Sequence, residues 1–148
     1  IGAVNIGTRT GFTLLEVLVV VLIITILATL VGVRVAGEPG KARTAAAIAQ
    51  IRSFSTALSL YRMQNGHIPT ESQGLQALVA RPTTPPVPQS YPEGGYLESL
   101  RVPQDPWQRD YVYLVPGPGG APYEIVSYGA DGEPGGEGEA ADISSAGL

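Results

Sequence analysis

Residues 17–33 form a continuous apolar run, interrupted only by Thr25 and Thr29, and no other feature constrains the fold as strongly. At about 1.5 Å per residue, a helix over residues 12–33 is about 33 Å long, which is enough to cross a lipid bilayer. A segment in lipid must satisfy its own backbone hydrogen bonds, so a helix is favoured despite the many β-branched residues. We therefore predict a membrane-spanning helix over residues 12–34.

One acidic residue, Glu16, stands at the start of this run. A carboxylate inside a membrane costs about a few kcal/mol and usually serves a function. Cleavage of the chain after Gly11 would give Phe12 a new α-amino group about one helical turn from this carboxylate. A chain with an amine, one acid beside it and an apolar helix beyond is suited to pack against copies of itself.

The hexapeptide GFTLLE at residues 11–16 resembles the cleavage and methylation signature of type IV pilins and pseudopilins. The resemblance implies that a prepilin peptidase cuts between Gly11 and Phe12 and then methylates the Phe12 amine. It also implies that Glu16 neutralises the amine of a neighbouring subunit during filament assembly.

Two simpler interpretations compete with this one. An ordinary secretory signal peptide has an apolar core of about 7–15 residues followed by a small-residue cleavage site. The run over residues 17–33 is longer, and no clean Ala-x-Ala site follows it. A plain signal anchor is the other interpretation, but it gives no reason for Glu16.

The basic residues conflict with the pilin-like orientation. Arg9 is the only basic residue before the apolar run, whereas Arg34, Lys41 and Arg43 follow it. A count of Lys and Arg would place the C-terminal side in the cytoplasm, while the resemblance implies the opposite. The segment before the cleavage site, the leader, also begins at Ile1 rather than Met. We therefore expect the leader to be truncated or its start misassigned.

Composition limits the functions available to the rest of the chain. The net charge is −4, with acids concentrated after Glu124, which disfavours a nucleic-acid partner. With no cysteine and only one histidine, His67, Cys-His and His-based metal sites are excluded. Nothing beside His67 indicates a nucleophile elbow, so we predict a solvated loop histidine and no catalytic residue. An exported domain without disulfides must be held by its core, its neighbours or a bound ion.

Gly37, Pro39 and Gly40 predict a break in the helix near residues 35–38, with helix resuming at Lys41. An apolar stripe at three- and four-residue steps then predicts packing against a core, and Asn65-Gly66 predicts the C-cap. The stripe consists of Ile48, Ile51, Phe54, Leu58 and Tyr61.

The chain after His67 is rich in turns. We predict a short helix over residues 74–80, capped by Thr70 or Ser72, and an extended connection over residues 82–92, which carries five prolines. Residues 111–115 and 123–128 read as a β-hairpin around a Pro-Gly turn. A third strand is predicted near residues 96–100, and Trp107 is predicted at the core or its edge.

Four further segments carry a second resemblance: PTESQGLQALV at residues 69–79, YPEGGYL at 91–97, PQDPW at 103–107 and SYGADG at 127–132. In this order they closely resemble the major pseudopilin family of the type II secretion system, over the whole chain from Gly11. The absence of cysteine agrees, because many type IV pilins close a C-terminal loop with a disulfide.

The resemblance implies an α+β, type IV pilin-like fold, with a long N-terminal helix, half transmembrane, packed on a small antiparallel sheet. The expected parts are a leader (residues 1–11), a transmembrane half-helix (12–34), a periplasmic half-helix (35–66) and an α+β periplasmic head (67–148). Subunits are expected to wait in the bacterial inner membrane and then stack into a periplasmic filament that pushes folded proteins across the outer membrane. Expected partners are its own copies, minor pseudopilins, an inner-membrane assembly platform with an ATPase, and the prepilin peptidase. The alternatives are a type IV pilin of a surface fibre for adhesion, motility or DNA uptake, and a membrane-anchored calcium-binding module that does not polymerise.

The acidic C-terminal loop is the one segment where metal chemistry is plausible. Asp131 and Asp142 flank a glycine-rich loop, and calcium takes six to eight oxygens from carboxylates and carbonyls. On composition alone, a solvated acidic tail is the alternative. The family resemblance implies a calcium loop over residues 128–143, with Asp131, Asp142 and the main-chain carbonyls of Tyr128 and Glu133 as ligands.

The chain departs from the family pattern in two places. Ala141 stands where many members carry a further acid, and the loop is longer than in the shorter members, so Glu137, Glu139 or water would have to compensate. Thr25 and Val33 stand where members often have a glycine and a proline tied to local helix melting, a role for which Gly32 and Pro39 are the candidates.

Overall fold

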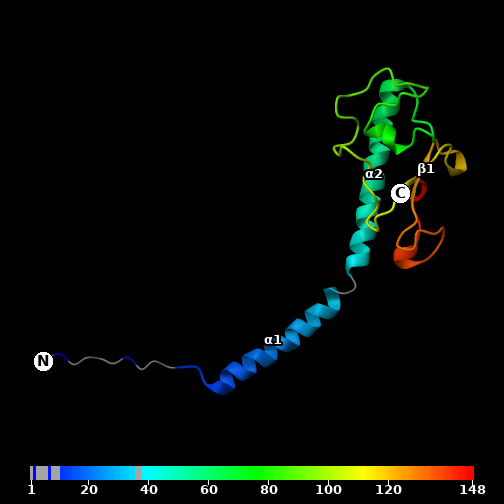
Figure 1. Cartoon of the computed structure of the whole chain (residues 1–148). Coiled ribbons are helices and arrows are strands. Elements are labelled where there is room, and N and C mark those ends of the chain that lie inside the picture. The colour runs from blue at the N-terminus through cyan, green and yellow to red at the C-terminus, as the bar shows by residue number, and fades with distance from the viewer. Residues whose placement is uncertain (1, 3–6, 8–10, 36–37) are drawn as a thin grey trace. The chain divides into compact units, whose positions relative to one another are not determined.

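The computed structural model describes residues 2, 7, 11–35 and 38–148. The chain divides into two units, Ile1–Pro39 and Gly40–Leu148, and each is described by itself (Figure 1). In the described residues, two α-helices are followed by short 3₁₀ helices and strands: α1 (Leu14–Val35), α2 (Glu38–Asn65), η1 (Leu75–Leu78), β1 (Val112–Leu114), η2 (Pro118–Gly120), β2 (Glu124–Ser127), η3 (Gly138–Ala140), β3 (Ile143–Ser144) and η4 (Ser145–Gly147).

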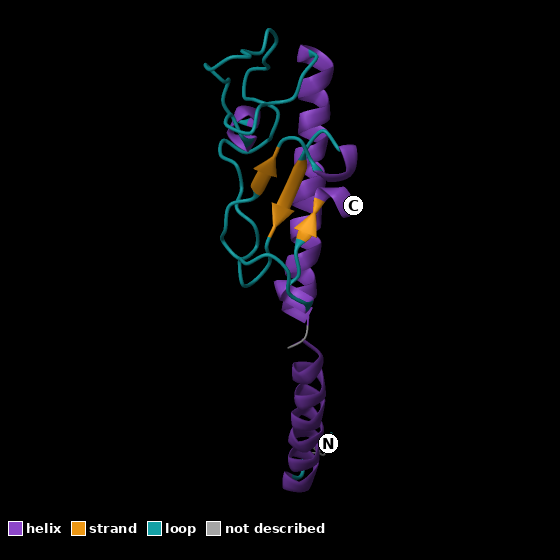
Figure 2. Cartoon of the chain, turned by 90° about the vertical axis from the view of Figure 1, so that its right-hand side faces the viewer, coloured by secondary structure: helices purple, strands orange, loops and turns teal. Residues whose placement is uncertain are grey.

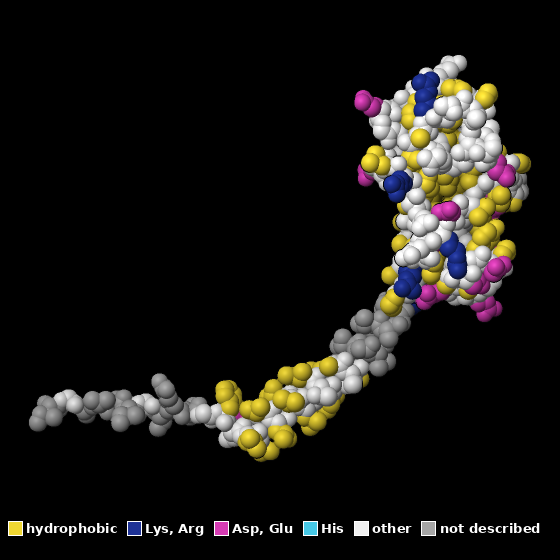
Figure 3. Space-filling view, viewed as in Figure 1, with side chains coloured by type: hydrophobic (Ala, Val, Ile, Leu, Met, Phe, Trp, Pro, Cys, Tyr) yellow, Lys and Arg dark blue, Asp and Glu magenta, His cyan; other side chains and the backbone are white. Residues whose placement is uncertain are grey.

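Helix α1 begins where Thr13 caps it, since the Thr13 Oγ1 accepts a hydrogen bond from the Glu16 amide at 3.2 Å. The hydroxyls of Thr25 and Thr29 bond back to carbonyls one turn earlier, at 2.7 Å to Val21 and 2.9 Å to Thr25. The large apolar side chains up to residue 30 are exposed, and they cover the helix surface in Figure 3. Among the residues described, no helix has the combination of length and apolarity that a membrane span requires.

The helix break predicted near residues 35–38 falls on residues 36 and 37, outside the described residues. The prediction that helix resumes at Lys41 is wrong, because α2 begins at Glu38. Pro39 lies in the first turn of α2, where the missing N–H would have had no helical partner and the fixed φ suits a helix.

Helix α2 buries the predicted stripe. Ile51, Leu58 and Tyr61 are fully buried and Phe54 nearly so, with Ala47 and Ala57 completing the same face. Ile48 is only half-buried at its edge. The predicted C-cap is confirmed: Gly66 has a φ of 77° and its amide donates to the Arg62 carbonyl at 2.7 Å.

A three-stranded antiparallel sheet lies alongside α2 (Figure 2). The predicted hairpin is confirmed, with β1 paired to β2 in the register Val112↔Val126 and Tyr113↔Ile125. The third strand predicted near residues 96–100 is wrong. The third strand is β3, which pairs Ile143 with Ser127. A strand of two residues is too short to show an alternation of apolar and polar side chains.

The core joins α2 to the sheet through aromatic residues. The rings of Phe54 and Tyr111 meet edge-on at 5.1 Å. Trp107 is half-buried against this core, as predicted. His67, predicted to be solvated, is half-buried instead, and its ring lies edge-on to Tyr61 at 5.8 Å. The result is the α+β head expected from the sequence.

The predicted short helix is the 3₁₀ helix η1, which begins at Leu75 after Gly74, and no side chain caps it. Thr70 instead forms a reciprocal pair with Gln73 one turn earlier: the Gln73 amide donates to the Thr70 hydroxyl, and the Thr70 amide donates to the Gln73 side chain. Gln73 also donates to the Thr84 carbonyl at 2.7 Å, which fastens the proline-rich connection to the head.

Candidate functional site

The predicted cleavage site lies just outside α1. Gly11 and Phe12 precede the first helical residue, Leu14, and both are exposed, Phe12 to 82%. A side chain at Gly11 would meet no atom within 4 Å. Glu16 is exposed in the first turn of α1, where the helix dipole favours a negative charge. The structure therefore leaves the Gly11-Phe12 bond open and places the single acid of α1 beside it in sequence.

The acidic C-terminal segment is a folded loop between β2 and β3. The Ala130 amide donates to the Glu139 carbonyl at 2.8 Å, which ties the two sides of the loop together. Gly129 has a φ of 65°, and a Cβ there would lie 2.6 Å from the Glu139 carbonyl oxygen. Only glycine allows this close backbone approach, so the loop closes at Gly129.

The predicted calcium ligands lie in this loop. The Asp131 Oδ1 accepts from the Glu133 amide at 3.1 Å, and the Asp142 Oδ2 accepts from the Gly135 amide at 2.9 Å. The Asp131 carboxylate thus closes a local turn, and the Asp142 carboxylate bonds back to the middle of the loop. Asp131, Glu133 and Asp142 are exposed, while Tyr128 is half-buried.

The donor set matches calcium in kind, since carboxylate and carbonyl oxygens are the ligands that calcium prefers. It is short in acids: within the part of the chain that the structure describes, no group of three or more His, Cys, Asp and Glu side chains is placed to hold a metal ion. Glu139 does not replace the acid missing at Ala141. Its carboxylate lies against Gly40 and pairs with the Arg43 guanidinium at 3.7 Å, at the start of α2.

Sequence reasoning missed Asp105, which ties the Asp-Pro-Trp turn to the loop. Asp105 is 4% exposed. Its Oδ1 accepts from the amides of Trp107 (3.1 Å) and Arg109 (2.9 Å), and its Oδ2 accepts from the Ser127 hydroxyl at 2.7 Å. A buried carboxylate needs such donors. The Ser127 oxygen in turn accepts from the Gly129 amide at 3.3 Å, at the entry of the loop.

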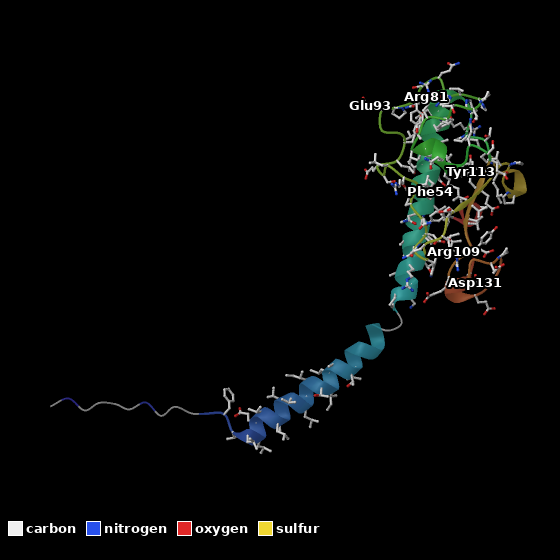
Figure 4. All side chains as sticks on the ribbon, viewed as in Figure 1. Phe54, Arg81, Glu93, Arg109, Tyr113 and Asp131 are labelled. Atoms are coloured by element: carbon white, nitrogen blue, oxygen red, sulfur yellow. The ribbon has the colours of Figure 1, made fainter. Side chains whose placement is uncertain are left out.

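Arg109 was also missed. Its Nη1 donates to the carbonyl oxygens of Gly129 at 3.0 Å and Ala130 at 2.8 Å. Figure 4 shows Arg109 beside the loop that carries Asp131. Asp105 carried one sequence signal, an acid directly before a proline in a turn, whereas Arg109 carried none.

Two family models match the chain in succession. The prokaryotic N-terminal methylation motif matches residues 7–32, and the model described as type II secretion system (T2SS), protein G, matches residues 34–146.

Several curated proteins named type II secretion system core protein G are similar over nearly their whole length. The protein of Vibrio cholerae is 47% identical over 137 residues, which cover 93% of this chain and 91% of the relative. The protein of Pseudomonas aeruginosa is 43% identical, with 93% and 94% covered. Among solved structures, the major pseudopilin from the type 2 secretion system of enterohaemorrhagic Escherichia coli matches with a TM-score of 0.64 and 38% identity, over 76% of this chain and 94% of that one.

Proposed function

Since the chain belongs to the type II secretion system protein G family, the major pseudopilins, we propose that it polymerises into a periplasmic pseudopilus whose extension pushes folded proteins across the outer membrane. The observation that carries the proposal is the succession of a methylation motif over residues 7–32 and a protein G match over residues 34–146 in one chain. This succession favours the first of the three functions considered from the sequence.

The residues at the start of α1 supply the chemistry of assembly in this proposal. Cleavage after Gly11 gives Phe12 a cationic amine, and the Glu16 carboxylate of a neighbouring copy neutralises it. Pairing is favoured because an unpaired charge in an apolar filament core loses its hydration. The exposed apolar side chains of α1 are available first to lipid and then to neighbouring copies, with the head in the periplasm.

We also propose that the loop holds calcium through Asp131, Asp142 and the main-chain carbonyls of Tyr128 and Glu133. The support is the folded loop, the two carboxylates in it and the oxygen chemistry of the donors. A bound calcium would supply a divalent positive charge to a segment with five acids: Asp131, Glu133, Glu137, Glu139 and Asp142.

The full chain produced together with a prepilin peptidase tests the assembly proposal. Mass spectrometry of the mature N-terminus is expected to show loss of residues 1–11 and one added methyl group on Phe12. Electron microscopy of the membrane extract is expected to show filaments. A mature start beyond residue 33, or a processed protein that stays monomeric, would contradict the proposal.

A further inference from the structure

The guanidinium of Arg109 covers the first part of the C-terminal loop. It donates to the Gly129 and Ala130 carbonyls at 3.0 and 2.8 Å. It also lies over Gly132, where a Cβ would come within 2.6 Å of the guanidinium carbon. One cation therefore contacts the backbone on both sides of Asp131.

The turn over residues 105–109 fixes where this cation sits. The Asp105 amide donates to the Arg109 carbonyl at 2.8 Å, and the Arg109 amide donates to the buried Asp105 carboxylate at 2.9 Å. The same carboxylate accepts from Ser127, whose oxygen accepts from the Gly129 amide. The Gly129 amide thus donates to Ser127, and the Gly129 carbonyl accepts from Arg109. Both Ser127 and Arg109 are bonded to Asp105, in the turn over residues 105–109.

We propose that Arg109 is a positioning residue that acts as an internal cation of the loop. Its charged donors hold residues 129–132 closed without a metal ion, and its charge lowers the affinity of the loop for calcium. Hydrogen bonds from a charged donor are about twice as strong as neutral ones, so two of them at one loop entry are a substantial restraint. A fixed positive charge beside a divalent cation repels it. The first half of this proposal stands by itself, and the second half rests on the calcium proposal above.

The test compares the full chain in detergent micelles with its Arg109→Met variant, which keeps an apolar stem and loses the charge and the donors. Hydrogen exchange of the loop amides, measured by mass spectrometry in chelator, is expected to be about tenfold or more faster in the variant, a loss of local protection. Exchange in the core of α2, residues 51–61, is expected to stay unchanged. Arg101→Met is the control, because Arg101 is an exposed arginine outside the loop.

The calcium affinity of the loop distinguishes an internal cation from a merely structural residue. Loss of a merely structural residue would weaken calcium binding, whereas loss of a repelling charge strengthens it. Trp107 is the only tryptophan and its amide bonds Asp105, so its fluorescence reports on this turn. Half-saturation is expected at a calcium concentration about three- to tenfold lower in Arg109→Met than in the native chain, because a repelling charge has gone. Calcium is also expected to restore the loop protection lost in the variant.

The outcomes separate the two proposals. Equal loop exchange in chelator, with and without Arg109, would overturn the internal-cation proposal. Faster loop exchange with no effect of calcium in either protein would support the internal cation and overturn the calcium proposal. If Arg109→Met also raises exchange throughout α2, Arg109→Gln, a neutral but polar replacement, supplies the same comparison with the same deciding result.

Discussion

Four tyrosine hydroxyls of the unit Gly40–Leu148 lie where ionisation is disfavoured. Burial raises the pKa of Tyr111, and the nearby Asp105 carboxylate raises it further. Burial likewise raises the pKa of Tyr113, with smaller contributions from Tyr123 and Tyr61. The pKa values of Tyr61 and Tyr91 are raised by burial and by Tyr96. The folded head therefore keeps phenol protons that the unfolded chain has already released at high pH.

This linkage predicts alkaline sensitivity. An acid whose pKa is higher in the folded state contributes stability that is fully present below the unfolded pKa of about 10 and is lost as pH rises further. Urea midpoints measured from pH 8 to 12 are expected to fall above about pH 10. Tyr113→Phe is expected to have a shallower fall, although losing the bond to the Pro69 carbonyl lowers its stability by about 1 kcal/mol at pH 8. An equally steep fall would contradict this assignment.

Single residues differ in how far the sequence predicts them. Asp131 and Asp142 lie in a short glycine-rich segment, so composition drew attention to both. Asp105 and Arg109 work through Ser127 and Gly129, 22 and 20 residues further along the chain. Contacts at that separation depend on how β2 is placed, which no local pattern encodes.

At the scale of elements, the C-terminal loop depends on its close turn at Gly129. Gly129→Ala introduces a side chain at a φ of 65° and 2.6 Å from the Glu139 carbonyl oxygen, so backbone must move. We expect a loss of about 2–4 kcal/mol in the free energy of unfolding, measured by urea denaturation.

Gly119→Ala is the matched control for this substitution. Gly119, in η2, has a φ of 62°, yet a Cβ there would meet no atom within 4 Å. Its cost should be the left-handed backbone alone, about 1 kcal/mol. Equal costs for the two variants would mean that the approach of Gly129 to residue 139 is not a packing constraint.

The elements predicted correctly are those with a repeating local pattern. The apolar stripe of α2 recurs over several helical turns. The hairpin consists of two runs of strand-forming residues on either side of a Pro-Gly segment. The start of α2 was misplaced because Pro39 was read as a helix breaker, although a proline is compatible with a first turn. Strand β3 has two residues and is held by pairing with β2, so only the tertiary structure reveals it.

For the unit Gly40–Leu148 as a whole, calcium is expected to raise the melting temperature, because in the calcium proposal it binds the folded state and not the unfolded chain. At about a hundredfold over Kd the gain is about 2.7 kcal/mol, which for the unit Gly40–Leu148, about a hundred residues, is a shift on the order of 10 °C. Asp131→Asn and Asp142→Asn are each expected to abolish most of the shift, measured on the full chain in detergent with calcium and with chelator.

Two controls accompany this measurement. Glu93→Gln removes an exposed acid outside the loop and should leave the shift intact. Ser144→Ala should also keep the shift, but from a lower melting temperature, because the Ser144 hydroxyl donates to Glu124 at 2.5 Å across β3 and β2. Equal melting temperatures of the native chain with calcium and with chelator would mean that Asp131 and Asp142, without a further acid at Ala141, do not form a calcium site.

In the assembly proposal, contacts between molecules are made by α1, which belongs to the other unit of the chain. Glu16→Gln keeps the size of the side chain and removes its charge. If the proposed pairing operates, the amine of a neighbouring Phe12 then has no partner in the apolar filament core. We expect membrane insertion to persist, because a costly charge has gone. Filament yield, counted by electron microscopy of membrane extracts, should fall about tenfold or more, the scale of one desolvated charge pair. The melting temperature of the head should not change, because α1 and the head belong to separate units.

Thr13→Ala distinguishes the effect of the Glu16 charge from the effect of capping the start of α1. This variant loses the hydroxyl that accepts from the Glu16 amide at 3.2 Å, yet it keeps the carboxylate. If charge pairing drives assembly, Thr13→Ala should still form filaments, because a lost cap frays one turn without removing the charge. If helix capping were the requirement, Thr13→Ala would fail and Glu16→Gln would assemble, and that pattern would rule out the pairing mechanism.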